Sequence, residues 1–107
     1  MLFRSLASSG TIGIAGAFST TATFTSGGYV NTGSTIDYNA TGAQTVIAFN
    51  YNNLTISGAR TTSSVTLASS GTIGIAGAFS TTATFTSGGY VNTGSTINYN
   101  EIGRAHV

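Results

Sequence analysis

The chain is 107 residues long, has a net charge of +1 and only 5% charged residues, and consists mostly of Gly, Ser, Thr and Asn. So little charge excludes the basic surface with which proteins bind nucleic acid or anionic membranes. The lack of cysteine excludes disulfides and thiolate metal sites, and no apolar run is long enough to cross a bilayer. Thr, Ile, Tyr and Phe are frequent and favour strands, so we predict one domain of almost entirely β-structure.

One stretch of the sequence occurs twice. Residues 6–39 return as residues 67–100 with a single change, Asp37 to Asn98, so the chain has a 61-residue period. A spacer, residues 40–66, separates the two copies. Self-similarity at a fixed period is typical of repeat proteins, in which each unit stacks on the next.

The two ends of the chain break this pattern. Residues 101–107 can be encoded by GAG ATC GGA AGA GCA CAC GTC, and residues 1–5 by GTG CTC TTC CGA TCT with GTG as start codon. The second string is the reverse complement of part of the first, and both resemble a translated sequencing adapter. We therefore expect residues 6–100 to be an internal piece of a longer repeat protein. We expect no functional role for the titratable side chains of the two ends, which are Arg4, Glu101, Arg104 and His106.

Short alternations of apolar and polar residues recur along residues 6–100, and a period of two predicts half-buried strands. In chain order the apolar pairs are Ile12 and Ile14, Ala22 and Phe24, Ile36 and Tyr38, Leu54 and Ile56, Val65 and Leu67, Ile73 and Ile75, Ala83 and Phe85, and Ile97 and Tyr99. Residues 44–50 also predict a strand, but Val46 with Ala48 and Ile47 with Phe49 compete for its buried face. Clusters of Gly, Ser, Asn and Thr between the runs predict tight turns.

The spacing of four apolar pairs indicates how the repeat is subdivided. The residues that end these pairs are Tyr38, Ile56, Ile75 and Tyr99, and the three steps from the first to the last make up one whole period. Three coils of about 20 residues per repeat predict a β-solenoid, a parallel β-helix in which each coil stacks on the next. The alternative fold is a β-sandwich of about seven strands, which explains the alternation but not the internal thirds.

Motifs for chemistry are few. Three glycines have a spacing that resembles a nucleotide-binding loop, Gly10, Gly13 and Gly16. No helix signal follows them and the chain has no lysine, so they are interpreted as residues of tight corners. Asp37 has no second carboxylate or histidine within residues 6–100, and Arg60 lies in a predicted turn as a solvated corner residue. We therefore predict no enzyme activity, no catalytic residue, no cofactor and no metal site.

Both copies contain a run of alternating threonines that is a candidate binding surface. These residues are Thr21, Thr23, Thr25, Thr82, Thr84 and Thr86. Threonines that project from a flat solenoid face can order water or pack on a crystalline or glycan surface. The β-propensity of threonine explains the same pattern without any ligand.

Residues 33–46 read GSTIDYNATGAQTV, and residues 51–58 read YNNLTISG. These runs resemble repeat segments of large secreted bacterial surface proteins, adhesin-like chains similar to the filamentous haemagglutinin and autotransporter class. The resemblance covers residues 6–100 and implies a parallel β-helix outside the cell or on its surface. It implies a structural or adhesive stalk, with a glycan or a host surface as partner, and assigns no catalytic residue.

Two other functions are weighed against the stalk. One is recognition of ice, a crystal or a glycan by the threonine runs, and the other is a carbohydrate-active β-helix enzyme, which the scarcity of carboxylates disfavours. A solenoid cut within its array exposes strand edges and apolar coil ends. We therefore expect this chain to self-associate, with no nucleic-acid partner and no insertion into a membrane.

Overall fold

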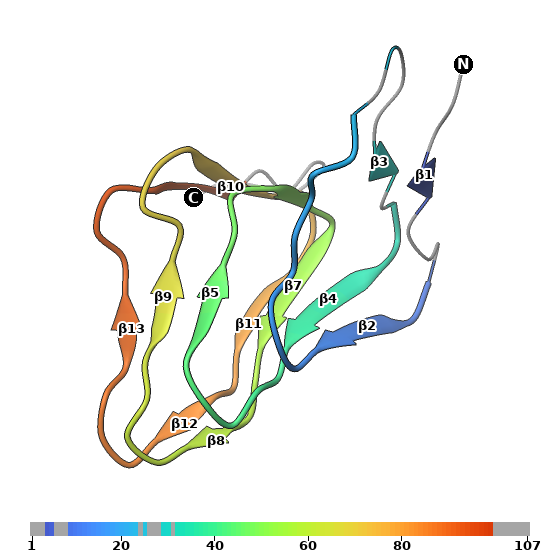
Figure 1. Ribbon diagram of the computed structural model, residues 1–107. Helices are drawn as coiled ribbons and strands as arrows, with labels where there is room; N and C mark the ends of the chain where they lie inside the picture. Colours follow the sequence, from blue (N-terminus) through green and yellow to red (C-terminus); the bar gives the residue numbers. More distant parts are fainter. Residues whose placement is uncertain (1–3, 6–8, 24, 26–28, 31, 100–107) are drawn as a thin grey trace, which may run out of the picture.

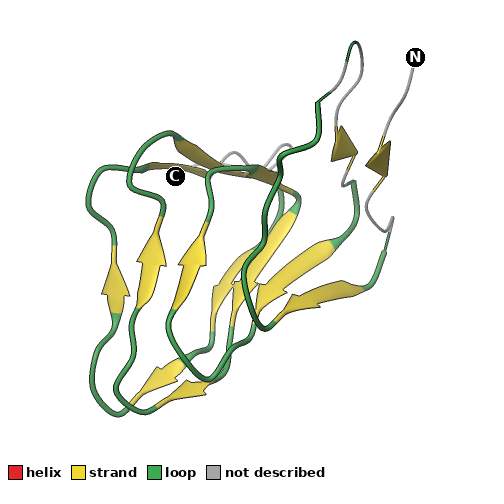
Figure 2. Ribbon diagram, in the orientation of Figure 1, coloured by secondary structure: helices red, strands yellow, loops and turns green. Residues whose placement is uncertain are grey.

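A computed structural model of the protein describes residues 4–5, 9–23, 25, 29–30 and 32–99. All regular structure in these residues is β-strand, and every strand pair is parallel (Figures 1 and 2). A β-sandwich is built from antiparallel sheets, so this alternative is excluded. The strands stack coil on coil, and the predicted β-solenoid is confirmed.

The chain makes about four turns, and strands of successive turns stack into shared parallel sheets (Figure 1). The β4 sheet consists of β2 (Thr11–Ile14), β4 (Thr35–Tyr38), β7 (Asn53–Ile56) and β11 (Phe79–Thr81). A short corner sheet follows, made of β8 (Ala59–Arg60) and β12 (Thr84–Phe85). The β5 sheet consists of β5 (Gln44–Val46), β9 (Val65–Leu67) and β13 (Tyr90–Val91). The β6 sheet consists of β6 (Asn50–Tyr51), β10 (Thr72–Ile75) and β14 (Thr96–Tyr99), while β1 (Arg4–Ser5) pairs with β3 (Tyr29–Val30).

The coils are uneven in length. One row of paired residues crosses the β4 sheet through Ile14, Tyr38, Ile56 and Thr81, and its middle step is clearly shorter along the chain than the other two. The corresponding row of the β6 sheet has two equal steps, through Tyr51, Ile75 and Tyr99. The predicted equivalences of Tyr38 with Ile56 and of Ile75 with Tyr99 are therefore confirmed. The predicted equivalence of Ile56 with Ile75 is wrong, because these residues belong to different sheets.

Identical sequences consequently occupy different faces of the solenoid. The run TIGI forms β2 of the β4 sheet in the first copy and β10 of the β6 sheet in the second. The repeat period is thus not a whole number of coils, which differs from the expected three coils per 61-residue repeat. A strand with an apolar residue at every second position can be placed on either face, because both faces cover the same apolar interior.

The inward side chains form one buried strip that runs through the coils. Its members are Ile36, Tyr38, Val46, Tyr51, Leu54, Ile56, Val65, Leu67, Ile73 and Ile75. Neither of the two pairs that competed for the buried face of residues 44–50 points inward as a whole. Val46 is wholly buried at the end of β5, Ala48 is exposed, and Ile47 and Phe49 are half-buried. Full burial of a large apolar side chain contributes about 1.5–3 kcal/mol, so this strip is the main source of stability.

Burial decreases at the ends of the stack. Ile97 and Tyr99 were predicted to be an inward pair, but their side chains are 39% and 49% exposed. Their strand, β14, is the last of the β6 sheet in the described residues, so no described coil covers it. Ile12 and Ile14 are only half-buried for the same reason, since β2 is the first strand of the β4 sheet.

Candidate binding groove

The two threonine runs do not combine into one array. All six side chains are exposed, as Thr21, Thr23, Thr25, Thr82, Thr84 and Thr86. Thr84 lies in β12 and has Ala59 of β8 as its strand neighbour. The first-copy run follows β2 outside any strand of the described residues. Each threonine is therefore available to solvent, but the runs are not stacked into rows on one face.

Arg60 departs most from the sequence interpretation, because it is 1% exposed rather than solvated. Alternation in β8 turns its side chain inward. Its guanidinium donates to the carbonyl oxygens of Gly42 (3.1 Å) and Ser57 (2.5 Å) and to Oε1 of Gln44 (2.9 Å). Its Cζ lies 6.0 Å from the ring centroid of Phe85. Within the described residues no carboxylate pairs with Arg60, so neutral acceptors and an aromatic face hold the cation.

Gln44 connects this arginine to the first coil. Its Oε1 accepts from Arg60 and from the backbone N–H of Ala40, which is 3.2 Å away. Its Nε2 donates to the carbonyl oxygens of Ile14 (2.5 Å) and Gly16 (3.0 Å). One buried amide side chain therefore fixes the segment that follows β2 alongside β5.

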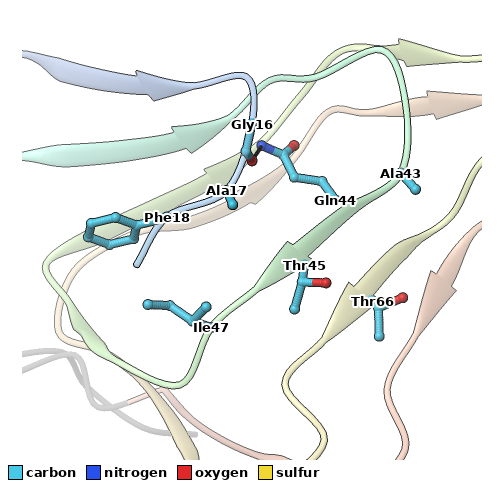
Figure 3. Close-up of a pocket in the computed structure, with 8 residues that line it drawn as sticks. All are labelled: Gly16, Ala17, Phe18, Ala43, Gln44, Thr45, Ile47 and Thr66. Carbon is cyan, nitrogen blue, oxygen red and sulfur yellow. Dashed lines mark hydrogen bonds between the residues drawn. The ribbon is translucent and has the colours of Figure 1, made fainter. Parts of the chain in front are cut away.

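A groove of about 370 Å³ opens between that segment and β5 (Figure 3). The residues that line it are Gly16, Ala17, Phe18, Ala43, Gln44, Thr45, Ile47 and Thr66. Phe18 makes an edge-to-face contact with Phe49, with ring centroids 5.5 Å apart, and Ile47 adds an aliphatic surface. The hydroxyl groups come from Thr45 and Thr66. Since none of these side chains is titratable, the groove can bind through shape, apolar contact and hydrogen bonds.

The backbone of β5 also presents hydrogen-bonding groups to this groove. The N–H of Gln44 donates to the carbonyl oxygen of Ser64 at 3.3 Å, so Gln44 and Val46 face β9. Successive residues of a strand direct their N–H and C=O groups to opposite edges, so those of Thr45 point toward the groove. An edge of this kind is a template for a further strand.

Sequence reasoning assigned a binding role to none of the groove residues, since Gly16 was interpreted as a corner residue and Ile47 only as a strand residue. The strand predicted over residues 44–50 is confirmed only over Gln44–Val46, and the sequence pattern cannot show whether the edge of this strand is covered. That property depends on sheet order, which is determined by coil lengths elsewhere in the chain.

Two buried tyrosines share a hydrogen bond in the interior near the groove. The hydroxyl oxygens of Tyr38 and Tyr51 are 2.7 Å apart, and the Tyr51 hydroxyl also donates to the carbonyl oxygen of Ile47 at 2.8 Å. Burial raises the pKa of both phenols, and the proximity of Tyr38 raises the pKa of Tyr51 further. The folded state therefore retains both protons to higher pH than an exposed tyrosine does.

We expect the free energy of unfolding to fall steeply above about pH 10, the ordinary tyrosine pKa. Below that pH both phenols are protonated in the folded and unfolded states, so the pair adds no pH dependence. Above it the unfolded state loses protons that the folded state keeps, and each tyrosine lowers stability by up to about 1.4 kcal/mol per pH unit. Urea unfolding between about pH 9 and pH 11 measures this slope.

The double variant Tyr38→Phe/Tyr51→Phe should show a much smaller slope than the wild type. Tyr90→Phe is the matched control, because Tyr90 is 41% exposed. An unchanged slope in the double variant would show that other groups cause the alkaline transition.

The structure gives the other residues considered in the sequence analysis structural roles. Asp37 is half-buried on β4 and accepts a hydrogen bond from Oγ of Ser57 at 2.7 Å. Gly10 has φ +82° and forms a corner, as predicted, whereas Gly13 lies within β2. A Cβ atom at Gly13 would meet Nδ2 of Asn39 at 2.8 Å, so this glycine makes room for the next coil.

The described residues contain no helix that is long and apolar enough to cross a membrane. The same part of the chain has no group of three or more His, Cys, Asp or Glu placed to hold a metal ion. Glu101, Arg104 and His106 lie outside the described residues. Comparison with protein-family models, curated proteins and solved structures gives no match to this chain.

Proposed function

We propose that the chain is a structural segment without catalytic activity, part of an extracellular stalk or adhesive surface in a longer bacterial repeat protein. The observation that carries this proposal is the continuous stack of parallel coils around one buried strip. Such a stack lengthens by about 4.8 Å, one strand spacing, for every added coil. A sequence that repeats along this axis builds a rod whose length is set by the number of repeats.

The contacts between coils support the same role. Nδ2 of Asn53 donates to Oγ1 of Thr35 at 3.3 Å, and Oδ1 of Asn53 accepts from the N–H of Ala78 at 2.8 Å. One side chain thereby links three successive coils through neutral groups. Hydrogen bonds between uncharged groups are less sensitive to salt than exposed ion pairs, which suits a rod outside the cell.

The stalk proposal predicts a rod whose length is proportional to the number of repeats. Proteins with one, two and four repeat units between identical terminal caps are measured by electron microscopy and small-angle X-ray scattering. Each added unit should lengthen the rod by about 12 Å, because it adds two to three coils at the strand spacing. A length that is independent of unit number would contradict a stalk.

The same proteins separate the stalk from the other functions. Binding to glycans or host cells that increases with unit number supports an adhesive role. Ice shaping in a thermal-hysteresis assay would favour ice binding by the threonine runs. Cleavage of a glycan would contradict the proposal that the chain has no catalytic activity. Rods that show none of these activities would support a purely structural stalk.

A further inference from the structure

One short sequence has a strand partner in the second copy and none in the first. The sequence AFSTTAT covers residues 78–84 and also residues 17–23. In the second copy it contains β11, which pairs with β7. In the first copy it lies outside every strand of the described chain, and its backbone forms no hydrogen bond with another described residue.

The contacts of the second copy show what this sequence binds. The N–H of Leu54 donates to the carbonyl oxygen of Ala78 at 2.9 Å, and the carbonyl oxygen of Ile56 accepts from the N–H of Ala83 at 3.0 Å. The side chain of Asn53 adds another bond, because its Oδ1 accepts from the N–H of Ala78 at 2.8 Å. The partner is therefore a strand of sequence NLTI, which is β7 of the spacer.

In the first copy the equivalent backbone groups are available. The side chains of Ala17, Thr21, Ala22 and Thr23 are all exposed. Nε2 of Gln44 donates to the carbonyl oxygen that immediately precedes this segment, so its start is already fixed beside β5 (Figure 3). Unpaired backbone groups at the edge of a sheet are a template for a further strand.

The segment also lies on the face where a preceding repeat would meet it. Between the two copies the run TIGI moves from the β4 sheet to the β6 sheet, which is one face back along the path of the chain. The sequence AFSTTAT makes the same move, from the side of β5 in the first copy to the β4 sheet in the second. One rotation therefore relates both parts of the two copies. The same rotation places the equivalent of β7 from a preceding repeat next to residues 17–23.

We propose that residues 17–23 are the binding site for the spacer of a preceding repeat, whose β7 sequence pairs with Phe18–Thr20. The residue equivalent to Leu54 then lies opposite Phe18, and its N–H donates to the carbonyl oxygen of Ala17, as in the second copy. Phe18–Thr20 becomes a strand between the bound spacer and β5. The groove is then closed by the chain itself, because Thr45 directs its N–H and C=O toward it.

This inference rests on the proposed function for the existence of a preceding repeat. The binding site itself is tested with the full chain, because the spacer sequence can be supplied as a peptide.

A synthetic peptide with the sequence of residues 50–62 is titrated into the full chain, which is isotopically labelled at the alanine nitrogens. The amides of Ala17 and Ala22 are followed by NMR, because their counterparts Ala78 and Ala83 both donate to the spacer. Peptide near about 1 mM, the range expected for the addition of one strand, should move both signals toward those of Ala78 and Ala83. Hydrogen exchange at Ala22 should slow by at least about tenfold.

Two proline peptides are a matched pair. Leu54→Pro removes the N–H that donates to Ala17, so this peptide should leave the signals of Ala17 and Ala22 unchanged. Tyr51→Pro places the same residue before β7 and keeps every donor and acceptor that faces the site, so this peptide should act like the unmodified one. Equal effects of the two peptides would show that the signals do not report strand pairing and would contradict the proposal.

A longer chain supplies the spacer covalently. Residues 40–66 replace residues 1–5 in front of residue 6, which raises the effective concentration of the spacer at the site. Ala17 and Ala22 should then exchange as slowly as Ala78 and Ala83. The proposal is overturned if neither experiment changes Ala17 and Ala22. This includes a peptide that moves only the amides of β14, the strand that repeats the sequence of β4 and could pair with β7 in the same way.

Rod length separates this inference from the proposed function. Rods that lengthen with each unit while Ala17 and Ala22 stay unprotected support the stalk and overturn the binding site. Protection of both alanines in rods of constant length supports the binding site and contradicts the stalk.

Discussion

Replacing Arg60 by methionine should lower the free energy of unfolding by about 3–5 kcal/mol. Methionine retains an apolar side chain near Phe85 but leaves the carbonyl oxygens of Gly42 and Ser57 without the arginine donor, and it removes one of the two donors to Oε1 of Gln44. Each buried acceptor that loses its partner costs about 1–3 kcal/mol. Because a domain of this size is stable by only about 5–15 kcal/mol, the loss is a large fraction of the total.

Urea unfolding followed by circular dichroism measures this effect, at a concentration low enough to keep the chain monomeric. Arg60→Lys preserves the charge but lacks the planar fork that reaches several acceptors at once, so its cost should be intermediate. Thr61→Ala changes the exposed neighbour and should stay within about 0.5 kcal/mol of the wild type. An Arg60→Met variant as stable as Thr61→Ala would show that the guanidinium is solvated after all.

The sequence could not reveal the position of Arg60 because its acceptors come from other parts of the chain. Arg60 lies in a stretch of turn-forming residues that includes Gly58 and Thr61, so the local sequence indicated a solvated corner. Gly42 and Gln44 lie 18 and 16 residues earlier. They reach the guanidinium only because the coil between them is short, and coil length depends on register rather than on local propensity.

The alternation of apolar residues predicted most strands and the solenoid itself, since a period of two is a local property. It could not predict which copy of a sequence forms a strand. In the second copy Phe79 belongs to β11 and pairs with Leu54 of β7. In the first copy Phe18 stands in the identical sequence but belongs to no strand. The two copies differ because of their tertiary contacts. In the second copy, β11 pairs with β7, a strand of the preceding coil.

The groove follows from the same asymmetry. Phe18 and its neighbours form no strand on the edge of β5, and Gln44 instead holds them at the side of the groove. A candidate site built from two segments about 28 residues apart has no sequence motif. Only the placement of both segments in the coil reveals it.

Gly58→Ala should be the second most damaging of the changes considered, with a cost of about 2–4 kcal/mol. Gly58 has φ +98°, a left-handed conformation that costs an L-residue about 1–2 kcal/mol. A Cβ atom there would also overlap the carbonyl oxygen of Ala40 and lie 3.1 Å from that of Asn39. Both oxygens belong to the backbone of the neighbouring coil, so neither can rotate away as a side chain would.

Two other glycines separate the conformational cost from the overlap. Gly10 has φ +82° with no atom within 4 Å of an added Cβ, so Gly10→Ala should show only the conformational cost. Gly42 has the same open space without a left-handed φ, so Gly42→Ala should be neutral or stabilising by up to about 1 kcal/mol. Urea midpoints should therefore decrease in the order Gly42→Ala, Gly10→Ala, Gly58→Ala. The difference between the last two variants reports how closely neighbouring coils approach at Gly58. If they are equally stable, the coils are further apart at that corner than the structure places them.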